Sequence, residues 1–334
     1  MDFELTTERQ DYLDARKYTI LLACPGSGKT TCIVQKLKTI TRECEQTRSR
    51  GVGVLCLSFT NKACEEIKQK YRELHGENLK YPHEVCTIDS FVTRYILMPF
   101  WCLYKNIGQK PSVINEKEIS RSIYYRRNDD GREVLLKQFL RFGPDVHIYK
   151  PEDLTLSEAG YKFIGKSYNK MVLADAEKDL SDYSKKVWEY RIGKGILNST
   201  DTLWVGKYII EHNPEIAQTL AQRFPYIVVD EAQDTSKWQF DIFEKLRNGG
   251  VENMEFVGDL NQSICCTFLY VLLVSKLLVY IFTPIIKNIG GSFKIMIAAL
   301  MTFYNLNSSP KNVQKRPFFS FFSRFSLSLH SQIQ

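Results

Sequence analysis

The chain has 334 residues, with 45 Lys and Arg against 38 Asp and Glu and a net charge of +7. This length allows two domains with buried cores and excludes a small disulfide-stapled module. Seven basic and no acidic residues follow Asp259, so residues 1–259 are neutral and their bulk charge indicates no particular partner. Nine cysteines without C-x-x-C spacing favour reduced, mostly buried thiols over a zinc site, in an intracellular compartment. The first residues, MDFELTTERQ, are typical of neither a secretory signal nor a transit peptide.

The stretch LLACPGSGKTT, residues 21–31, has the pattern of a phosphate-binding loop. An apolar run over residues 18–23 predicts a strand, residues 24–30 a Gly-rich turn, and the spacing over 31–40 a helix. Such a turn directs backbone amides at phosphate oxygens, while the lysine reaches the β- and γ-phosphates and the first threonine holds Mg²⁺. The residues expected to bind ATP are Ala23, Cys24, Pro25, Gly26, Ser27, Gly28, Lys29, Thr30 and Thr31.

The stretch PYIVVDEAQD, residues 225–234, supplies paired carboxylates after a second apolar run. Residues 226–229 predict a buried strand, and parallel sheets place ligand chemistry at the carboxyl ends of their strands. We therefore expect Asp230 to hold Mg²⁺ and Glu231 to act as the general base that activates water. Taken alone, the pair could be an ordinary solvated strand end, but it follows a phosphate-binding loop.

The letters DEAQ followed by Asp234 resemble the motif of superfamily 1 helicases of the UvrD/Rep type. LTTERQDYL, residues 5–13, resembles the Q motif of that family, which implies that Gln10 reads the adenine. VGDLNQSI, residues 257–264, resembles motif III, which implies that Gln262 senses the γ-phosphate and that Gly258 and Asp259 shape the turn. The catalytic residues implied in this way are Lys29, Glu231 and Gln262.

Two further stretches resemble the DNA-facing motifs of the family, namely LSFTNKACEEIKQK (57–70, motif Ia) and CTIDSFVTRYI (86–96, motif Ib). The resemblance implies that single-stranded DNA is contacted by Phe59, Thr60, Asn61, Thr87, Ser90 and Phe91. Either phenylalanine could instead be a core aromatic. Asp89 departs from the family, because many members have a histidine there that faces the DNA, and a carboxylate should repel phosphate.

The resemblance predicts an α/β P-loop fold, in which one RecA-like parallel sheet is flanked by helices. Residues 1–95 and 200–265 would form this ATP-binding domain, and residues 96–199 a mostly helical insertion. REVLLKQFLRF (132–142) and AEKDLSDYSKKVWEY (176–190) have helical spacing. YYRRNDDGRE (124–133) and GKGILNST (193–200) favour exposed loops.

The resemblance ends after Ile264, and no second RecA-like domain is expected to follow. Residues 266–334 form a hydrophobic, basic tail with three interpretations. A membrane span over residues 268–286 is disfavoured by Lys276 and Pro284. A genuine amphipathic or core segment would need an apolar period, which is missing. The preferred hypothesis is translation of an unspliced intron or a shifted frame, because the composition suits A/T-rich codons.

The resemblance implies an ATP-dependent DNA helicase, of a kind that serves DNA repair. It would use ATP and Mg²⁺ for 3′ to 5′ translocation on single-stranded DNA and for unwinding at duplex junctions, in the cytoplasm or a nucleus. Without a second motor domain, we expect this chain to bind Mg-ATP weakly and to unwind nothing, unless a partner chain supplies that domain. The alternative is a non-catalytic fragment that binds nucleic acid or a partner and retains the ATP-binding fold.

Overall fold

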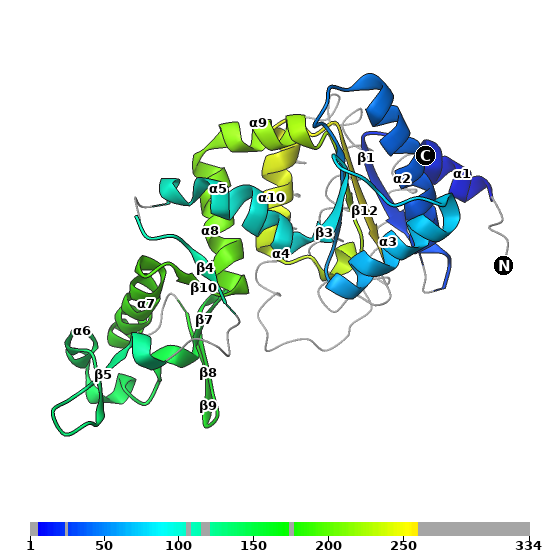
Figure 1. Ribbon diagram of the computed structural model, residues 1–334. Coiled ribbons are helices and arrows are strands. Elements are labelled where there is room, and N and C mark those ends of the chain that lie inside the picture. Colours follow the sequence, from blue (N-terminus) through cyan, green and yellow to red (C-terminus); the bar gives the residue numbers. More distant parts are fainter. Residues whose placement is uncertain (1–5, 24–25, 105–107, 115–120, 174–176, 260–334) are drawn as a thin grey trace, which may run out of the picture. The chain divides into compact units, whose positions relative to one another are not determined.

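Figure 1 shows the fold of the chain as a computed structural model. The structure describes residues 6–23, 26–104, 108–114, 121–173 and 177–259. Cys24, Pro25, Gln262 and the tail with its three interpretations therefore lie outside the described residues.

A five-stranded sheet forms the centre of the fold, and every neighbouring pair of its strands is parallel. Its spatial order is β1 (Tyr18–Leu22), β12 (Asn253–Gly258), β11 (Tyr226–Val229), β2 (Val54–Ser58) and β3 (Glu84–Thr87). The order differs from the chain order because parallel strands require crossover connections. The predicted α/β fold is confirmed, as are the strands predicted over residues 18–23 and 226–229.

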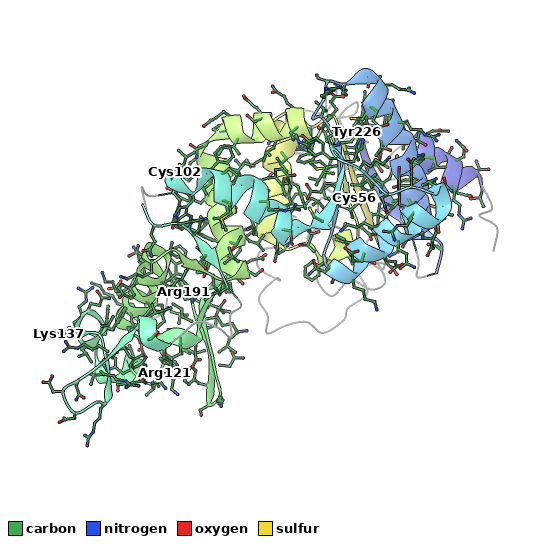
Figure 2. All side chains as sticks on the ribbon, in the orientation of Figure 1. Cys56, Cys102, Arg121, Lys137, Arg191 and Tyr226 are labelled. Carbon is green, nitrogen blue, oxygen red and sulfur yellow. The ribbon has the colours of Figure 1, made fainter. Side chains whose placement is uncertain are left out.

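Side chains of the central strands point alternately into two separate hydrophobic cores, because successive strand residues face opposite sides of a sheet. In β2, Leu55 and Leu57 pack in one core, and Val54 and Cys56 pack in the other. Tyr226 begins β11 in the same core as Cys56, and Figure 2 labels both residues on the central sheet. Both faces of the sheet are thus buried, which explains its nearly unbroken apolar strands.

Three helices contribute to the core that contains Cys56. They are α1 (Thr7–Asp14), α2 (Lys29–Thr47) and α3 (Asn61–His75). In α2, Ile33, Leu37, Ile40 and Cys44 are buried and recur every three or four residues, which makes one apolar face. The predicted helix over residues 31–40 is confirmed and extends to Thr47.

The other core is covered by helices from two separate parts of the chain. After β3 come α4 (Ile88–Phe91), a π-helical turn (Val92–Leu97) and α5 (Met98–Phe100). Much later come α8 (Ser199–His212), α9 (Pro214–Arg223) and α10 (Lys237–Asn248). Helices α8 and α10 both begin with a capping box, in which Asn198 pairs with Asp201 and Ser236 with Gln239.

The segment between α5 and α8 contains small sheets as well as helices, so the expectation of a mostly helical insertion needs correction. Its strands and α-helices are β4 (Ser112–Val113), β5 (Tyr125–Arg127), β6 (Glu133–Leu135), α6 (Lys137–Leu140), β7 (Leu154–Ser157), β8 (Gly160–Gly165), β9 (Tyr168–Val172), α7 (Lys178–Gly193) and β10 (Ile196–Leu197). Short 3₁₀ helices also lie at Trp101–Leu103, Arg121–Ile123, Pro144–Val146 and Pro151–Asp153. In β8, Phe163 is buried and its neighbour Ile164 is 51% exposed, which is the period of a half-buried strand.

Three local predictions in this segment have different outcomes. The helix predicted over 176–190 is confirmed as α7, whereas the one predicted over 132–142 is only α6, preceded by β6. The loop predicted over 124–133 is a hairpin of β5 and β6, which turns at Gly131 with a φ of +75°. The loop predicted over 193–200 is wrong in part, because it holds β10 and the fully buried cap Asn198.

A buried ion pair holds α7 to α8. The guanidinium of Arg191 donates to both carboxylate oxygens of Asp201, at 2.9 and 2.7 Å, and neither side chain is exposed. Trp188 donates its indole N–H to the same carboxylate, and the Arg191 Nη1 donates to the Leu154 carbonyl oxygen in β7. Figure 2 labels Arg191 among the side chains of this segment. Both bonds to Asp201 come from the same nitrogen, Nη2, and together with the Trp188 contact they hold α7 against the start of α8.

Six cysteines fall within the described residues, and none of these six forms a disulfide. Only Cys102 among them is exposed, and the others are Cys32, Cys44, Cys56, Cys64 and Cys86. The expectation of free, mostly buried thiols is confirmed for this part of the chain. In the described ranges, no helix is both long and apolar enough to cross a membrane.

His83, just before β3, makes the stability of this fold depend on pH. Its Nδ1 accepts a hydrogen bond from the Val54 N–H at 3.0 Å, which requires an unprotonated Nδ1, and its Nε2 lies 3.3 Å from Glu45. Burial lowers the pKa of His83, and Glu45 only partly opposes this effect. Protonation is therefore easier in the unfolded chain, so the free energy of unfolding should fall as the pH drops below about 6.5.

The variant His83→Asn tests this prediction, because an amide oxygen can accept the same hydrogen bond but does not titrate. Denaturant unfolding of both proteins at pH 7.5 and pH 5.5 should show the stability advantage of the wild type shrinking at the lower pH. An advantage that is equal at both pH values would contradict the account.

Candidate functional site: a nucleotide-binding edge of the sheet

The phosphate-binding loop connects β1 to α2 at the carboxyl edge of the sheet. The Ala23 N–H donates to the Gly258 carbonyl oxygen at 3.0 Å, which extends the pairing of β1 with β12. Gly26 and Gly28 have φ values of +74° and +88°, in the left-handed region that favours glycine. Helix α2 begins at Lys29, and its first backbone N–H groups point towards the loop because they have no partners within the helix. No side chain caps them, since the residue at the cap position is Gly28. This is the local geometry of an anion site.

The predicted acidic pair lies at the same edge, directly after the buried strand β11. The Asp230 N–H donates to the Leu57 carbonyl oxygen at 2.8 Å, which fixes its carboxylate at the end of the sheet. Glu231 follows with a φ of +51°, a left-handed conformation that costs a non-glycine residue about 1 kcal/mol or more. The Lys29 Nζ lies 3.6 Å from the Glu231 Oε2. The structure thus brings together the two halves of the predicted site.

The electrostatics of this edge suit a cation. Asp230 is 6% exposed, and burial, followed by the charge of Glu231, raises its pKa to about 6. Burial and Glu231 also raise the pKa of Asp234. A metal ion beside these carboxylates would favour their ionised forms. A bound cation would therefore offset the cost of keeping these carboxylates ionised.

The residues present fit ATP and Mg²⁺. A Cβ added to Gly26 would meet no atom within 4 Å, so there is room over the loop. Thr30 lies in the first turn of α2 next to Lys29. The Ser58 hydroxyl, at the end of β2 beside the strand that Asp230 follows, is buried without a hydrogen-bond partner among the described residues. The part of the chain that the structure describes contains no cluster of three or more His, Cys, Asp or Glu able to hold a metal. One carboxylate, one hydroxyl and phosphate oxygens are the usual ligands of Mg²⁺ in P-loop sites.

Gln233 connects the acidic pair to the end of β12, a role that the sequence analysis did not assign. Its Nε2 donates to the Glu231 Oε2 at 2.5 Å, and its Oε1 accepts from the Asp259 N–H at 3.0 Å. A Cβ added to Gly258 would lie 2.6 Å from that Oε1, so any side chain there would displace the Gln233 amide. Gln233 is part of the DEAQD stretch, so the sequence marks it as a residue of the site. Its hydrogen-bond partners could not be predicted, because the fold brings Asp259 next to it.

The residues predicted to contact DNA follow β2 and β3, two neighbouring strands of the sheet. Phe59 is 49% exposed directly after β2. Thr60 caps α3 by accepting from the Ala63 N–H at 3.1 Å, and Asn61 is exposed in the first turn of that helix. Phe59 and Asn61 are accessible to a ligand, and contact with DNA stays a prediction for both.

Phe91 is fully buried, so it cannot offer a face to a base. Its ring stacks on Tyr95 and meets Phe224 edge-on. The alternative that this phenylalanine is a core aromatic is therefore the one that the structure supports. Thr87 is also buried and caps α4, accepting from the Ser90 N–H at 3.1 Å and donating to the Ser90 hydroxyl.

Asp89 makes contacts within the protein. Its carboxylate accepts hydrogen bonds from the Ser199 hydroxyl, at the start of α8, and from the Gln239 amide at 3.4 Å. The N-terminus of α8 favours a negative charge in this place. The Asp89 carboxylate therefore bonds to α8 and α10 within the protein, whereas the family resemblance implied a residue facing DNA at this position.

The Q-motif helix α1 reaches the loop through a residue other than the predicted one. The Gln10 amide donates to the Asp14 carboxylate on the same helix at 2.8 Å. Arg9 extends to the loop instead, and its Nη2 donates to the Ser27 carbonyl oxygen at 2.9 Å. The adenine contact of Gln10 remains a prediction.

The sequence pattern of the UvrD/REP helicase N-terminal domain matches residues 5–265. The chain belongs to this family. The expected family resemblance is therefore confirmed, and the match ends next to Ile264, where the motif resemblance also ends.

Several named relatives of the family are similar to this chain. UvrD1 of Mycobacterium tuberculosis H37Rv, an ATP-dependent DNA helicase, is 27% identical over an alignment of 278 residues that covers 77% of this chain and 33% of the relative. The ATP-dependent DNA helicase Rep of Buchnera aphidicola is 25% identical over an alignment of 248 residues that covers 73% of this chain and 35% of Rep. The ATP-dependent DNA helicase PcrA of Staphylococcus aureus is 25% identical over an alignment of 257 residues that covers 73% of this chain and 31% of PcrA. The chain thus spans about a third of the length of these relatives.

Proposed function

We propose that this chain is the ATP-binding half of a DNA motor of the UvrD type. The observation that carries the proposal is the placement of Lys29 within 3.6 Å of Glu231, next to the buried Asp230, at one edge of a parallel sheet. A cation for phosphates, a carboxylate for a metal and a carboxylate for water are the parts that ATP hydrolysis requires.

Each residue at this edge has a role in the proposal. Lys29 would hold the β- and γ-phosphates, and Thr30 with Asp230 would hold Mg²⁺, which neutralises phosphate charge when bound. Glu231 would orient the attacking water and accept its proton. Gln233 would hold the Glu231 carboxylate in place through the 2.5 Å hydrogen bond between them. The γ-phosphate contact of Gln262 belongs to the same proposal.

We propose single-stranded DNA as the polymer that this half of the motor grips. Phe59, at 49% exposure, offers an aromatic face, and stacking on such a face tolerates any base sequence. The relatives are named ATP-dependent DNA helicases, so we extend the proposal to 3′ to 5′ translocation and unwinding at duplex junctions by a complete motor. DNA repair in the cytoplasm, or in a nucleus, is the proposed setting. Unwinding would require a second motor domain in addition to this ATP-binding half, and a partner chain could supply it.

A second candidate function is a non-catalytic fragment that binds nucleic acid or a partner. The observation that favours it is the exposed aromatic face of Phe59, which could bind nucleic acid without any hydrolysis of ATP. The two candidates differ in one property, because a motor changes its grip on DNA with the state of its nucleotide. A binding fragment should have an affinity for DNA that falls with salt but ignores ATP.

Fluorescence anisotropy with a labelled single-stranded oligonucleotide separates these functions. We expect Phe59→Ala to weaken binding about fivefold or more, since stacking contributes roughly 1–3 kcal/mol per base. Leu74→Ala is the matched control, because Leu74 is 41% exposed near the end of α3 and should not affect affinity.

The outcomes of this titration are distinct. DNA affinity that changes on addition of Mg-ATP supports the motor, and affinity that ignores ATP supports the binding fragment. No affinity for single strands at low salt would contradict both functions. If Phe59→Ala binds DNA as tightly as the wild type, Phe59 does not contact DNA.

A further inference from the structure

Arg9 is the side chain of α1 that touches the phosphate-binding loop. Its Nη2 lies 2.9 Å from the Ser27 carbonyl oxygen, across 18 residues of sequence. The same nitrogen would lie 3.4 Å from a Cβ placed on Gly28. The guanidinium therefore lies against the two residues that precede Lys29.

The position of Arg9 is fixed by the helix that carries it. Thr6 caps α1 by accepting from the Arg9 N–H at 3.4 Å. On the next turn, Tyr12 is buried against α2, and its carbonyl oxygen accepts from the Lys36 Nζ at 2.7 Å. Because α1 is anchored on the helix that follows the loop, the reach of Arg9 is a property of the packed fold.

The charge at this edge calls for a second cation. The Glu231 carboxylate lies 3.6 Å from the Lys29 Nζ, and two further carboxylates, Asp230 and Asp234, stand one residue before and three residues after Glu231 in the chain. A triphosphate adds further negative charge to the same place. The planar fork of a guanidinium matches two phosphate oxygens at once and stays charged at any physiological pH.

We propose that Arg9 is a second phosphate-binding cation of this site, which holds the phosphate tail of the nucleotide together with Lys29. The inference rests on the proposed ATP site and deepens it. In this inference, the residue of α1 that contacts the nucleotide is Arg9, and it binds phosphate. Gln10 instead donates a hydrogen bond to Asp14 on the same helix.

Isothermal titration of the purified 334-residue chain in Mg²⁺ tests the assignment with two probes, ATP and inorganic tripolyphosphate. We expect Arg9→Gln to weaken the binding of both probes by about tenfold, because the change removes a charge-assisted contact to phosphate. Arg9→Lys should recover part of the loss, because it keeps the charge but not the fork. The matched control is Arg50→Gln, which makes the same change at an exposed loop position and should bind both probes like the wild type.

Thermal unfolding without nucleotide should show that both Arg9 variants are folded, because Arg9 is only partly buried. Equal affinities of Arg9→Gln and the wild type for ATP would overturn the inference. If Arg9→Gln binds ATP more weakly but binds tripolyphosphate like the wild type, the inference is also overturned, because Arg9 would then contact the adenosine and not the phosphates.

Lys29→Ala separates failure of this inference from failure of the proposed function. If Lys29→Ala loses both probes while Arg9→Gln keeps both, only the role of Arg9 is refuted. If the wild type binds neither probe, the ATP site and the role of Arg9 are refuted together.

Discussion

Replacing Glu255 with leucine is expected to destabilise the folded protein by about 3–5 kcal/mol, because the change leaves a lysine buried without its counter-ion. The Lys36 Nζ lies 2.7 Å from the Glu255 Oε1, and the two side chains are only 1% and 3% exposed. The ammonium also lies 4.3 Å from the centre of the Tyr12 ring. This pair joins α1, α2 and β12.

Burial favours the neutral form of both members of this pair. It lowers the pKa of Lys36 and raises the pKa of Glu255, while each residue opposes the effect on the other. The partners therefore depend on each other, and Lys36→Met should cost about as much as Glu255→Leu.

The double variant Lys36→Met with Glu255→Leu is the control for this prediction. It replaces the pair with apolar groups of similar size, so it should cost much less than the sum of the single changes. Urea unfolding followed by circular dichroism gives all four free energies. Single changes that cost under about 1 kcal/mol, or that simply add, would contradict a coupled pair.

Lys29→Ala should weaken Mg-ATP binding about a hundredfold or more, which corresponds to roughly 2.7 kcal/mol. The ammonium lies where the β- and γ-phosphates would bind, and removing it leaves Glu231 without its 3.6 Å partner. The loss should appear as a weaker dissociation constant in a titration with a fluorescent ATP analogue.

Lys62→Ala is the control for that variant, because it removes the same charge from an exposed position on α3. It should bind the analogue like the wild type. Unchanged binding in Lys29→Ala would place the nucleotide elsewhere in the molecule.

The candidate site at the edge of the sheet was predictable from sequence because its signals are local. A strand, a Gly-rich turn and a helix are read within residues 18–40, and the structure places them as β1, the loop and α2. Asp230 and Glu231 follow a strand whose apolar residues are consecutive, as expected for a sheet buried on both faces. Parallel pairing then brings the two segments to one edge without any further information.

Contacts set by tertiary packing were not predictable in this way. Phe59 and Phe91 each follow a strand and look alike in sequence, yet one is exposed and the other fully buried. The difference arises from Tyr95 and Phe224, and the second of these lies far away in sequence. The reach of Arg9 to Ser27 likewise depends on how α1 packs on α2.

The segment between α5 and α8 was the hardest to predict because its strands are short. In β5 and β6, three residues each, a two-residue period cannot be told from helical spacing. The buried pair of Arg191 and Asp201 has no local signal either, since charged residues are usually exposed.

The most direct test of the account is a calorimetric titration of the purified chain with ATP, in the presence and absence of Mg²⁺. We predict one saturable site per chain, and tighter binding with Mg²⁺, because the buried Asp230 offers a metal ligand beside the phosphates. No saturable binding in either condition would contradict the claim that this edge of the sheet is an ATP site.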